Sequence, residues 1–166
     1  KKLREVNMNP LTSKNWIKIY GNSNVSQGLQ LKSNSGVDIE VRAACKEFCK
    51  WLRNEFSFPI RVPIYLKSAE RIKATDGDLV CGTFFEPNDR FVEPYIRIAT
   101  GDYEELREKY GRDDALATIL RSFAHEIVHY LQWINGFEQT DTEAERQAER
   151  YSKEILNMYA KTREHP

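Results

Sequence analysis

The feature that most constrains the fold is a run of apolar residues at helical spacing between residues 113 and 134. Apolar side chains recur there every three or four residues, which makes one side of a helix apolar along its whole length. A helix with such a stripe needs a surface to cover it, and the rest of the chain has to supply that surface. The stripe consists of Leu116, Ile119, Leu120, Phe123, Ile127, Leu131 and Ile134.

The segments around this helix predict an α+β domain. An apolar stripe also predicts a helix over residues 37–55, and a short helix over 102–111 and a final one over 142–160 are expected. Between them, FPIRVPIYLKS, RIKA, DLVCGTFFEP and EPYIRIATG alternate apolar and polar residues between turn residues, which indicates three or four short strands. The order helix, strands, helix, helix is typical of an α+β fold.

The chain of 166 residues has the size of one domain with a core of its own. We expect two parts: an N-terminal arm or small hairpin over residues 1–36 and the main domain over 37–166. The first part is rich in Asn, Ser, Gly and Lys and contains one strand-like run, NWIKIYG. Its basic residues predict a solvated surface, and a nucleic-acid-binding arm is the alternative.

The charge and the cysteine content indicate which partners and which cellular compartment to expect. The 25 basic and 25 acidic residues cancel, so bulk charge selects neither nucleic acid nor an anionic membrane as a partner. No apolar run is long enough for a membrane span, and the first residues lack the apolar core of a signal peptide. Cys45 and Cys49 lie one helical turn apart, where a disulfide would be strained. Reduced, buried thiols and a cytoplasmic location are therefore expected, with a metal site at these two cysteines as the alternative.

Two of the three histidines lie in the stretch RSFAHEIVHYLQW, on the side of the long helix opposite the apolar stripe. His125 and His129 are four residues apart, so both imidazoles share a helix face and can converge on one ion. A hydrogen-bonded core histidine would instead lie on the stripe. Two solvent-facing histidines are the other interpretation, but that interpretation does not account for Glu126 directly after the first histidine. We therefore expect a zinc site.

The third ligand is expected from the last helix, because the only other histidine, His165, is next to the last residue. An NGF turn after the long helix would fold the last helix back toward the histidines. There Glu145 and Glu149 share one flank, and two carboxylates at this spacing repel unless a positive group lies near them. A metal held by Glu145, with Glu149 orienting a histidine through its second ring nitrogen, supplies that group. A solvated acidic face balanced by Arg146 and Arg150 is the alternative.

The sequence HEIVH at residues 125–129 resembles the HExxH motif of the zincin metallopeptidases. Glu145 and Glu149 are similar to the downstream Glu-xxx-Asp or Glu-xxx-Asn pattern of the gluzincin branch, and EAERQAERYSKEIL looks most like its compact members, the minigluzincins and the ImmA/IrrE type. The resemblance covers residues 121–156 by motif and 60–134 by the order of elements. It implies a small, twisted, mostly antiparallel sheet packed on the active-site helix, followed by a C-terminal helix that carries the third ligand.

The resemblance also implies a chemistry. His125, His129 and Glu145 would hold Zn²⁺, and Glu126 would be the general base in the hydrolysis of peptide bonds by zinc-bound water. The expected partner is a peptide or protein substrate. The alternative function is a zinc-containing regulatory or peptide-binding module with weak or no catalysis.

The substrate is expected to lie extended beside an edge strand formed by Tyr95, Ile96, Arg97 and Ile98, which would offer backbone hydrogen bonds. A hydroxyl that stabilises the transition state is expected from Tyr95, Tyr130 or Tyr151.

Overall fold

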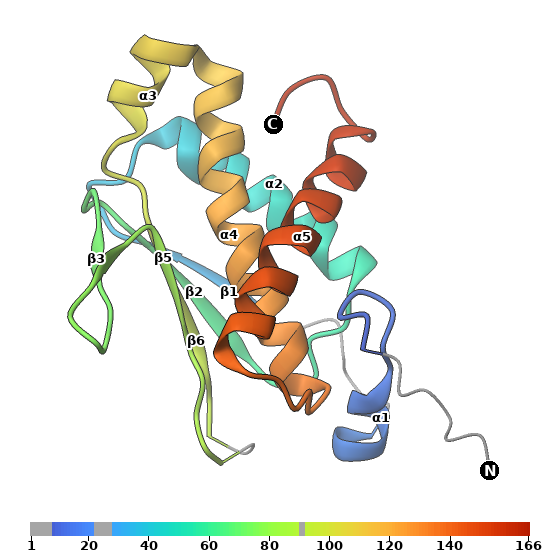
Figure 1. Ribbon diagram of the computed structural model, residues 1–166. Helices are drawn as coiled ribbons and strands as arrows, with labels where there is room; N and C mark the ends of the chain where they lie inside the picture. Colours follow the sequence, from blue (N-terminus) through green and yellow to red (C-terminus); the bar gives the residue numbers. More distant parts are fainter. Residues whose placement is uncertain (1–7, 22–27, 90–91) are drawn as a thin grey trace.

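The structure, a computed structural model, describes residues 8–21, 28–89 and 92–166, and these form a mixed α+β arrangement (Figure 1). The helices of the described residues are α1 (Asn15–Tyr20), α2 (Ile39–Glu55), α3 (Tyr103–Tyr110), α4 (Arg112–Ile134) and α5 (Asp141–Ala160). The strands are β1 (Leu29–Ser33), β2 (Val62–Lys67), β3 (Ile72–Lys73), β4 (Leu79–Val80), β5 (Gly82–Phe85) and β6 (Tyr95–Ala99). The predicted α+β class is confirmed, and so are the four helices expected from the sequence, to within two residues at each end.

The main sheet has the strand order β1-β2-β6-β5, and the short strands β3 and β4 pair separately. Within the main sheet, β1 pairs with β2 and β2 pairs with β6 in parallel, and β5 pairs with β6 antiparallel. The prediction of a mostly antiparallel sheet is therefore wrong. Helix α2 connects β1 to β2, and a helical crossover returns the chain in the same direction, which makes the two strands parallel.

The N-terminal segment is part of the main core rather than a separate arm. The strand expected at NWIKIYG is helix α1, whose Trp16 is buried and donates its backbone N–H to Asn135 Oδ1 at 3.1 Å. β1 forms one edge of the main sheet, and its first residue Leu29 is fully buried. The core therefore contains residues from both sides of the predicted boundary after residue 36. The basic residues at the start of the predicted arm, within 1–7, lie outside the described residues.

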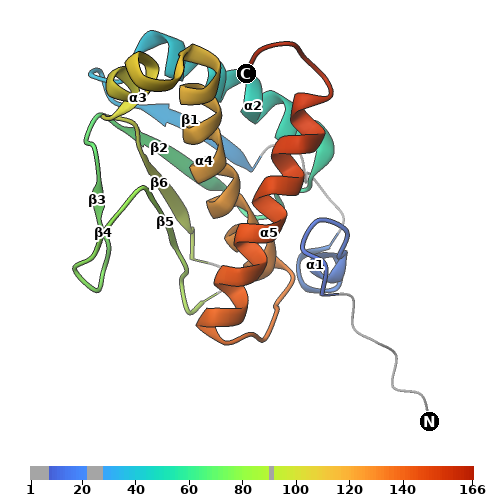
Figure 2. The ribbon, with the colours of Figure 1, turned by 45° about the horizontal axis from the view of Figure 1, so that its top comes forward.

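Helix α4 lies between the sheet and α5 in both views of the molecule (Figures 1 and 2). All residues of its predicted apolar stripe are buried. Ala124 and Val128, outside that stripe, are fully buried as well, because α5 packs along α4. Within the described part of the chain, no helix combines the length and apolar character that crossing a membrane requires.

The chain turns back between α4 and α5 in a Schellman motif. Gly136 has a φ of 65°, a left-handed conformation that glycine adopts without a steric penalty. Its N–H donates to Trp133 O at 3.1 Å, and the N–H of Phe137 donates to Gln132 O at 3.1 Å. Thr140 then caps α5 by accepting a hydrogen bond from the backbone N–H of Glu143. These two caps set where α4 ends and where α5 begins.

The two cysteines of α2 pack in the core. Cys45 and Cys49 are buried and free, and burial raises the pKa of both thiols, that of Cys49 to about 12. In the described residues, the only metal-ligating group that the side chains form lies elsewhere, at His125, His129 and Glu145. The interpretation of the pair as apolar packing is confirmed.

Phe48 joins three helices, and its removal is expected to destabilise the fold strongly. Its ring lies 5.2 Å from that of Phe123 on α4 and 4.9 Å from that of Tyr159 on α5, both edge to face. Phe48→Ala should lower the free energy of unfolding by about 3–5 kcal/mol in urea denaturation. As a control, Phe85→Ala, at a ring that is 42% exposed, should cost much less; equal losses would contradict this description of the core.

Candidate metal centre

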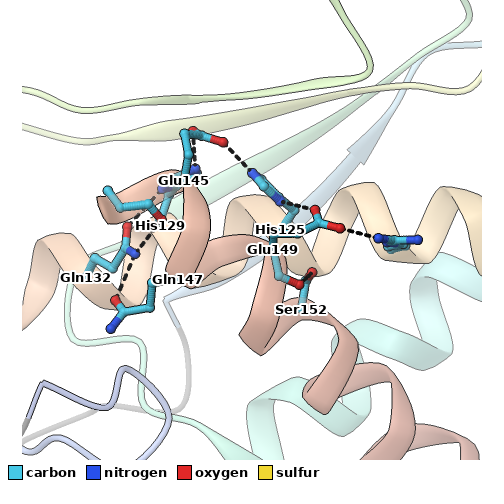
Figure 3. Close-up of polar contacts among 9 residues, drawn as sticks. His125, His129, Gln132, Glu145, Gln147, Glu149 and Ser152 are labelled. Atoms are coloured by element: carbon cyan, nitrogen blue, oxygen red, sulfur yellow. Dashed lines mark hydrogen bonds and ion pairs between the residues drawn. The ribbon is translucent and has the colours of Figure 1, made fainter. Parts of the chain in front are cut away.

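Three side chains from two helices converge at the surface where α4 and α5 meet (Figure 3). His125 and His129 project from successive turns of α4, and Glu145 from α5 lies between them. Glu145 Oε2 is 3.1 Å from His125 Nε2, and Glu145 Oε1 is 2.8 Å from His129 Nε2. The structure therefore brings together the two histidines and the glutamate predicted from the sequence.

The arrangement fits a metal ion. The three prospective ligand atoms all lie within 4.8 Å of one another. Ligand atoms around a tetrahedral zinc ion, at about 2.0–2.1 Å from it, would be about 3.3 Å apart. The distances from the Glu145 carboxylate to His125 Nε2 and His129 Nε2, 3.1 and 2.8 Å, are close to that spacing. Two imidazole nitrogens and one carboxylate oxygen are a donor set that zinc accepts, and three protein ligands leave a fourth position open.

Gln132 orients His129 and was missed in the sequence. His129 Nδ1 lies 2.8 Å from Gln132 Oε1, while Gln132 Nε2 donates to Ala144 O at 3.0 Å and to Gln147 Oε1 at 2.9 Å. With its amide nitrogen held by two acceptors, Gln132 presents its oxygen to His129, which places a proton on Nδ1 and directs Nε2 toward Glu145. The signal in the sequence was the spacing of three residues, which puts Gln132 next to His129 on the helix face.

Glu149, predicted to orient a histidine, lies near His125 but does not hydrogen-bond to it. Its Oε2 is 3.8 Å from His125 Nδ1, beyond hydrogen-bonding distance. The carboxylate is instead held by the guanidinium of Arg121 and lies 3.4 Å from Lys153 Nζ. The structure thus keeps Glu149 close to the centre, and its orienting role stays a prediction.

Glu126 is the buried acid of the centre. It is only 7% exposed, and burial raises the pKa of its carboxyl to about 7. Strand β5 passes directly over it, since a Cβ added to Gly82 would lie 3.1 Å from Glu126 Cγ and 3.3 Å from its Oε1. A glycine at position 82 therefore leaves room for this carboxylate.

The pKa shifts of the three prospective ligand residues follow from their burial and contacts. The hydrogen bond with His129 holds the pKa of Glu145 at about 2, well below its ordinary value. Burial and the neighbouring His129 lower the pKa of His125. Burial also opposes protonation of His129, but its hydrogen bond to Glu145 and the nearby Glu126 raise its pKa overall.

Two cavities meet at the centre and together form a groove between the β4–β5 segment and helices α4 and α5. One, of about 420 Å³, extends from His129 toward the end of α4. The other, of about 480 Å³, extends from His125 toward the start of α4. Gly82, Glu126 and Glu145 line both cavities.

The strand predicted to bind substrate is not an edge strand. β6 is paired on both sides, with β2 and with β5, and its Ile96 and Ile98 are fully buried. The prediction of an accessible edge at Tyr95, Ile96, Arg97 and Ile98 is therefore wrong. The edge on that side of the sheet is β5, the strand that borders the groove.

The tyrosines predicted to stabilise a transition state do not line the groove. The hydroxyl of Tyr130 is buried and donates to Ile60 O at 2.6 Å. Tyr95 stacks on Phe85 with ring centroids 4.9 Å apart, and Tyr151 lies beneath the guanidinium of Arg150.

His165, the remaining histidine, is also remote from the centre. Its Nδ1 is 2.7 Å from Asp113 Oδ2, in the first turn of α4, whereas His125 lies twelve residues further along that helix.

Comparisons with known proteins returned no match, whether with family models, with curated proteins or with solved structures.

Without metal, Glu145 is expected to stabilise the protein most at mildly acidic pH. Its folded pKa of about 2 lies below its ordinary 4.5, so its contribution is present above pH 4.5 and is lost as the pH falls toward 2. The pKa of His129 is raised above its ordinary 6.5, so its contribution is present below pH 6.5 and is lost as the pH rises through the raised value. The two windows overlap between pH 4.5 and 6.5.

Glu145→Gln should therefore cost more stability at about pH 5.5 than in alkaline solution. The loss should stay below about 1 kcal/mol, because the side chain of Glu145 is 63% exposed and solvent screens the pair. Urea denaturation of chelator-treated protein and variant at the two pH values measures the difference. A loss that does not change with pH would show that the pairs of Glu145 with the histidines do not stabilise the fold.

Proposed function

We propose that the protein is a zinc-dependent metallopeptidase of the zincin type, related to the compact gluzincins. One observation carries the proposal: His125, His129 and Glu145 converge within 4.8 Å beside a buried glutamate in an open groove. A structural zinc site is closed by four protein ligands, whereas a catalytic site keeps a position open. Three ligands beside Glu126 support the catalytic alternative.

Zinc is the ion that we propose. Imidazole and carboxylate donors suit it, and the described cysteines contribute no ligand to the centre. When bound, Zn²⁺ would supply Lewis acidity, which polarises a substrate carbonyl and makes water a better acid. The protein's own residues would perform the remaining tasks of binding, orientation and proton transfer.

Glu126 would move the proton. Its pKa of about 7 lets the carboxylate accept a proton from the attacking water near neutral pH and then donate it to the nitrogen of the leaving amine. A nearby cation would lower this pKa, because it favours the ionised form, so the value describes the metal-free protein. The low exposure of Glu126 strengthens its electrostatic interactions with the reacting groups.

Strand β5 would align the substrate, instead of β6 as predicted from the sequence. Its outer edge is unpaired in the main sheet and borders both cavities through Gly82. An extended peptide could therefore add to this edge by backbone hydrogen bonds. The absence of a side chain at Gly82 would let the scissile bond approach Glu126 closely.

A zinc-containing regulatory or peptide-binding module with weak or no catalysis is the alternative. It is favoured by one observation: among the described residues, no tyrosine lines the groove, where its hydroxyl could stabilise a developing oxyanion. The alternative also predicts zinc and peptide binding. It differs from the peptidase proposal in the role of Glu126, because a module without catalysis does not use this residue as a base.

A cytoplasmic location is part of the proposal. Its support is the pair of free, buried thiols at Cys45 and Cys49, which suit a reducing compartment.

The first test is metal content together with hydrolysis. Purified protein should contain about one zinc per chain by elemental analysis, and His129→Ala should contain none. Glu126→Gln should keep its zinc and lose peptide hydrolysis by about 10²-fold or more, because it removes the proton acceptor. Failure of the protein to take up zinc on titration would overturn the proposal. Zinc binding without hydrolysis by the unmodified protein would support the regulatory alternative.

Gln132 should be needed for tight zinc binding. Gln132→Ala removes the partner of His129 Nδ1 and should weaken zinc affinity by about 10- to 100-fold in a chelator competition. Glu149→Gln should cost less, because Glu149 lies 3.8 Å from His125 and is held by Arg121. Glu143→Gln, which removes a carboxylate from the first turn of α5 outside the groove, is the control. Equal affinities for the Gln132 variant and the control would contradict the orienting role.

A further inference from the structure

The two cavities of the groove differ in charge. The cavity on the His129 side is lined by the exposed carboxylates of Glu86 and Asp141 and by no lysine or arginine among the described residues. Neither carboxylate forms an ion pair within the described part of the chain. In the cavity on the His125 side, Arg121 is paired with Glu149. A positive charge of a bound peptide would therefore be favoured in the His129-side cavity.

The His129-side cavity also has an aromatic wall. Phe84 of β5 and Trp133 of α4 both line it, with ring centroids 6.3 Å apart, and Phe137 from the α4–α5 turn adds a third ring. The indole N–H of Trp133 donates to Pro87 O at 3.3 Å, which holds that ring in place. Lysine and arginine side chains carry apolar stems below their charged ends, so aromatic walls beside carboxylates suit both parts of such a side chain.

Glu126 is an independent sign that this cavity receives a ligand. The residue is only 7% exposed, and its side chain lines the cavity without a hydrogen bond or ion pair to the described residues. A buried polar group without a partner is costly unless a bound molecule satisfies it. The groove is therefore more than an acidic surface.

The direction of the peptide follows from the strand that borders the groove. β5 runs from Gly82, beside Glu126, toward Phe84 and the α4–α5 turn (Figures 1 and 2). Antiparallel pairing is slightly more stable per residue than parallel pairing. A peptide antiparallel to β5 would lay the residues before its scissile bond beside Phe84 and Glu86, and those after it beside Cys81 in the His125-side cavity.

We propose that the groove selects peptides with a lysine or arginine on the amino-terminal side of the cleaved bond, bound between the Phe84–Trp133–Phe137 wall and the carboxylates of Glu86 and Asp141. This inference rests on the proposed peptidase function. It assigns Glu86 and Asp141 to substrate selection, whereas Glu126 and the histidines act on the bond itself.

Cleavage-site mapping tests the proposal. Zinc-loaded protein is incubated with a mixture of synthetic peptides of varied sequence, and the products are identified by mass spectrometry. Lysine and arginine should be enriched before the cleaved bonds. Glu86→Gln and Asp141→Asn should each lower kcat/KM for a lysine-containing peptide by about two- to fivefold, mainly through KM, because each removes one exposed carboxylate. Both should lower cleavage of the matched glutamine peptide less than that of the lysine peptide.

The control is Glu143→Gln, which removes the same charge from the first turn of α5 but lies outside the His129-side cavity. It should leave the lysine preference intact. Cleavage without basic enrichment, or an equal loss in the control, would overturn the selection proposal and leave the peptidase function standing. Absence of any cleavage by the zinc-loaded protein would overturn the peptidase function and this inference with it.

Binding supplies a readout that does not depend on turnover. In the zinc-loaded Glu126→Gln variant, a lysine peptide should change the fluorescence of Trp133, which lines the cavity, whereas Trp16 and Trp51 are buried in the core. The lysine peptide should bind more tightly than its glutamate counterpart, and the difference should shrink with added salt. Equal affinities at low salt would overturn the charge selection.

Discussion

The packing of α5 along α4 is the interaction on which the site depends. α4 is covered on one side by the sheet and α2 and on the other by α5, so even Ala124 and Val128, outside its apolar stripe, are fully buried. Because the Schellman turn at Gly136 reverses the chain directly after α4, the first turns of α5 lie against the last turns of α4. Glu145 is thereby carried to the two histidines. Hydrophobic burial between the helices thus sets the geometry of a polar centre.

Glu126 and Glu145 have the same side chain, but their surroundings give the two carboxyl groups different pKa values. Glu126 points beneath β5, where burial raises its pKa to about 7, while the side chain of Glu145 is 63% exposed and hydrogen bonds to His129 hold its pKa at about 2. A buried carboxyl group such as that of Glu126 can exchange a proton near neutral pH. A hydrogen-bonded one such as that of Glu145 stays ionised and suits a cation. The proposed division of labour between base and ligand therefore follows from burial and contacts alone.

Helices α2 to α5 and the His125–His129–Glu145 grouping were predictable because each depends on spacing within a helix or on one short turn. The strands after α2 were predicted in the right segments, but their order in the sheet was not. α1 was expected as a strand, β1 was not predicted as a strand, and β6 was expected at the edge that β5 occupies. A pattern of apolar and polar residues tells which face of a strand is buried, and it does not tell which strand lies next to it. Sheet order depends on hydrogen bonds between segments far apart in the chain.

The sequence by itself determined the apolar stripe of α4, the helix face that carries His125 and His129, and the turn that returns α5. These are local properties, because 3.6 residues per turn and the conformational freedom of glycine act within a few residues. Only the tertiary structure decided that β5 borders the groove, that Gln132 rather than a carboxylate hydrogen-bonds Nδ1 of His129, and that Tyr130 turns its hydroxyl to Ile60. Each of these depends on which surfaces meet when hydrophobic burial closes the core, and local spacing carries no information about that.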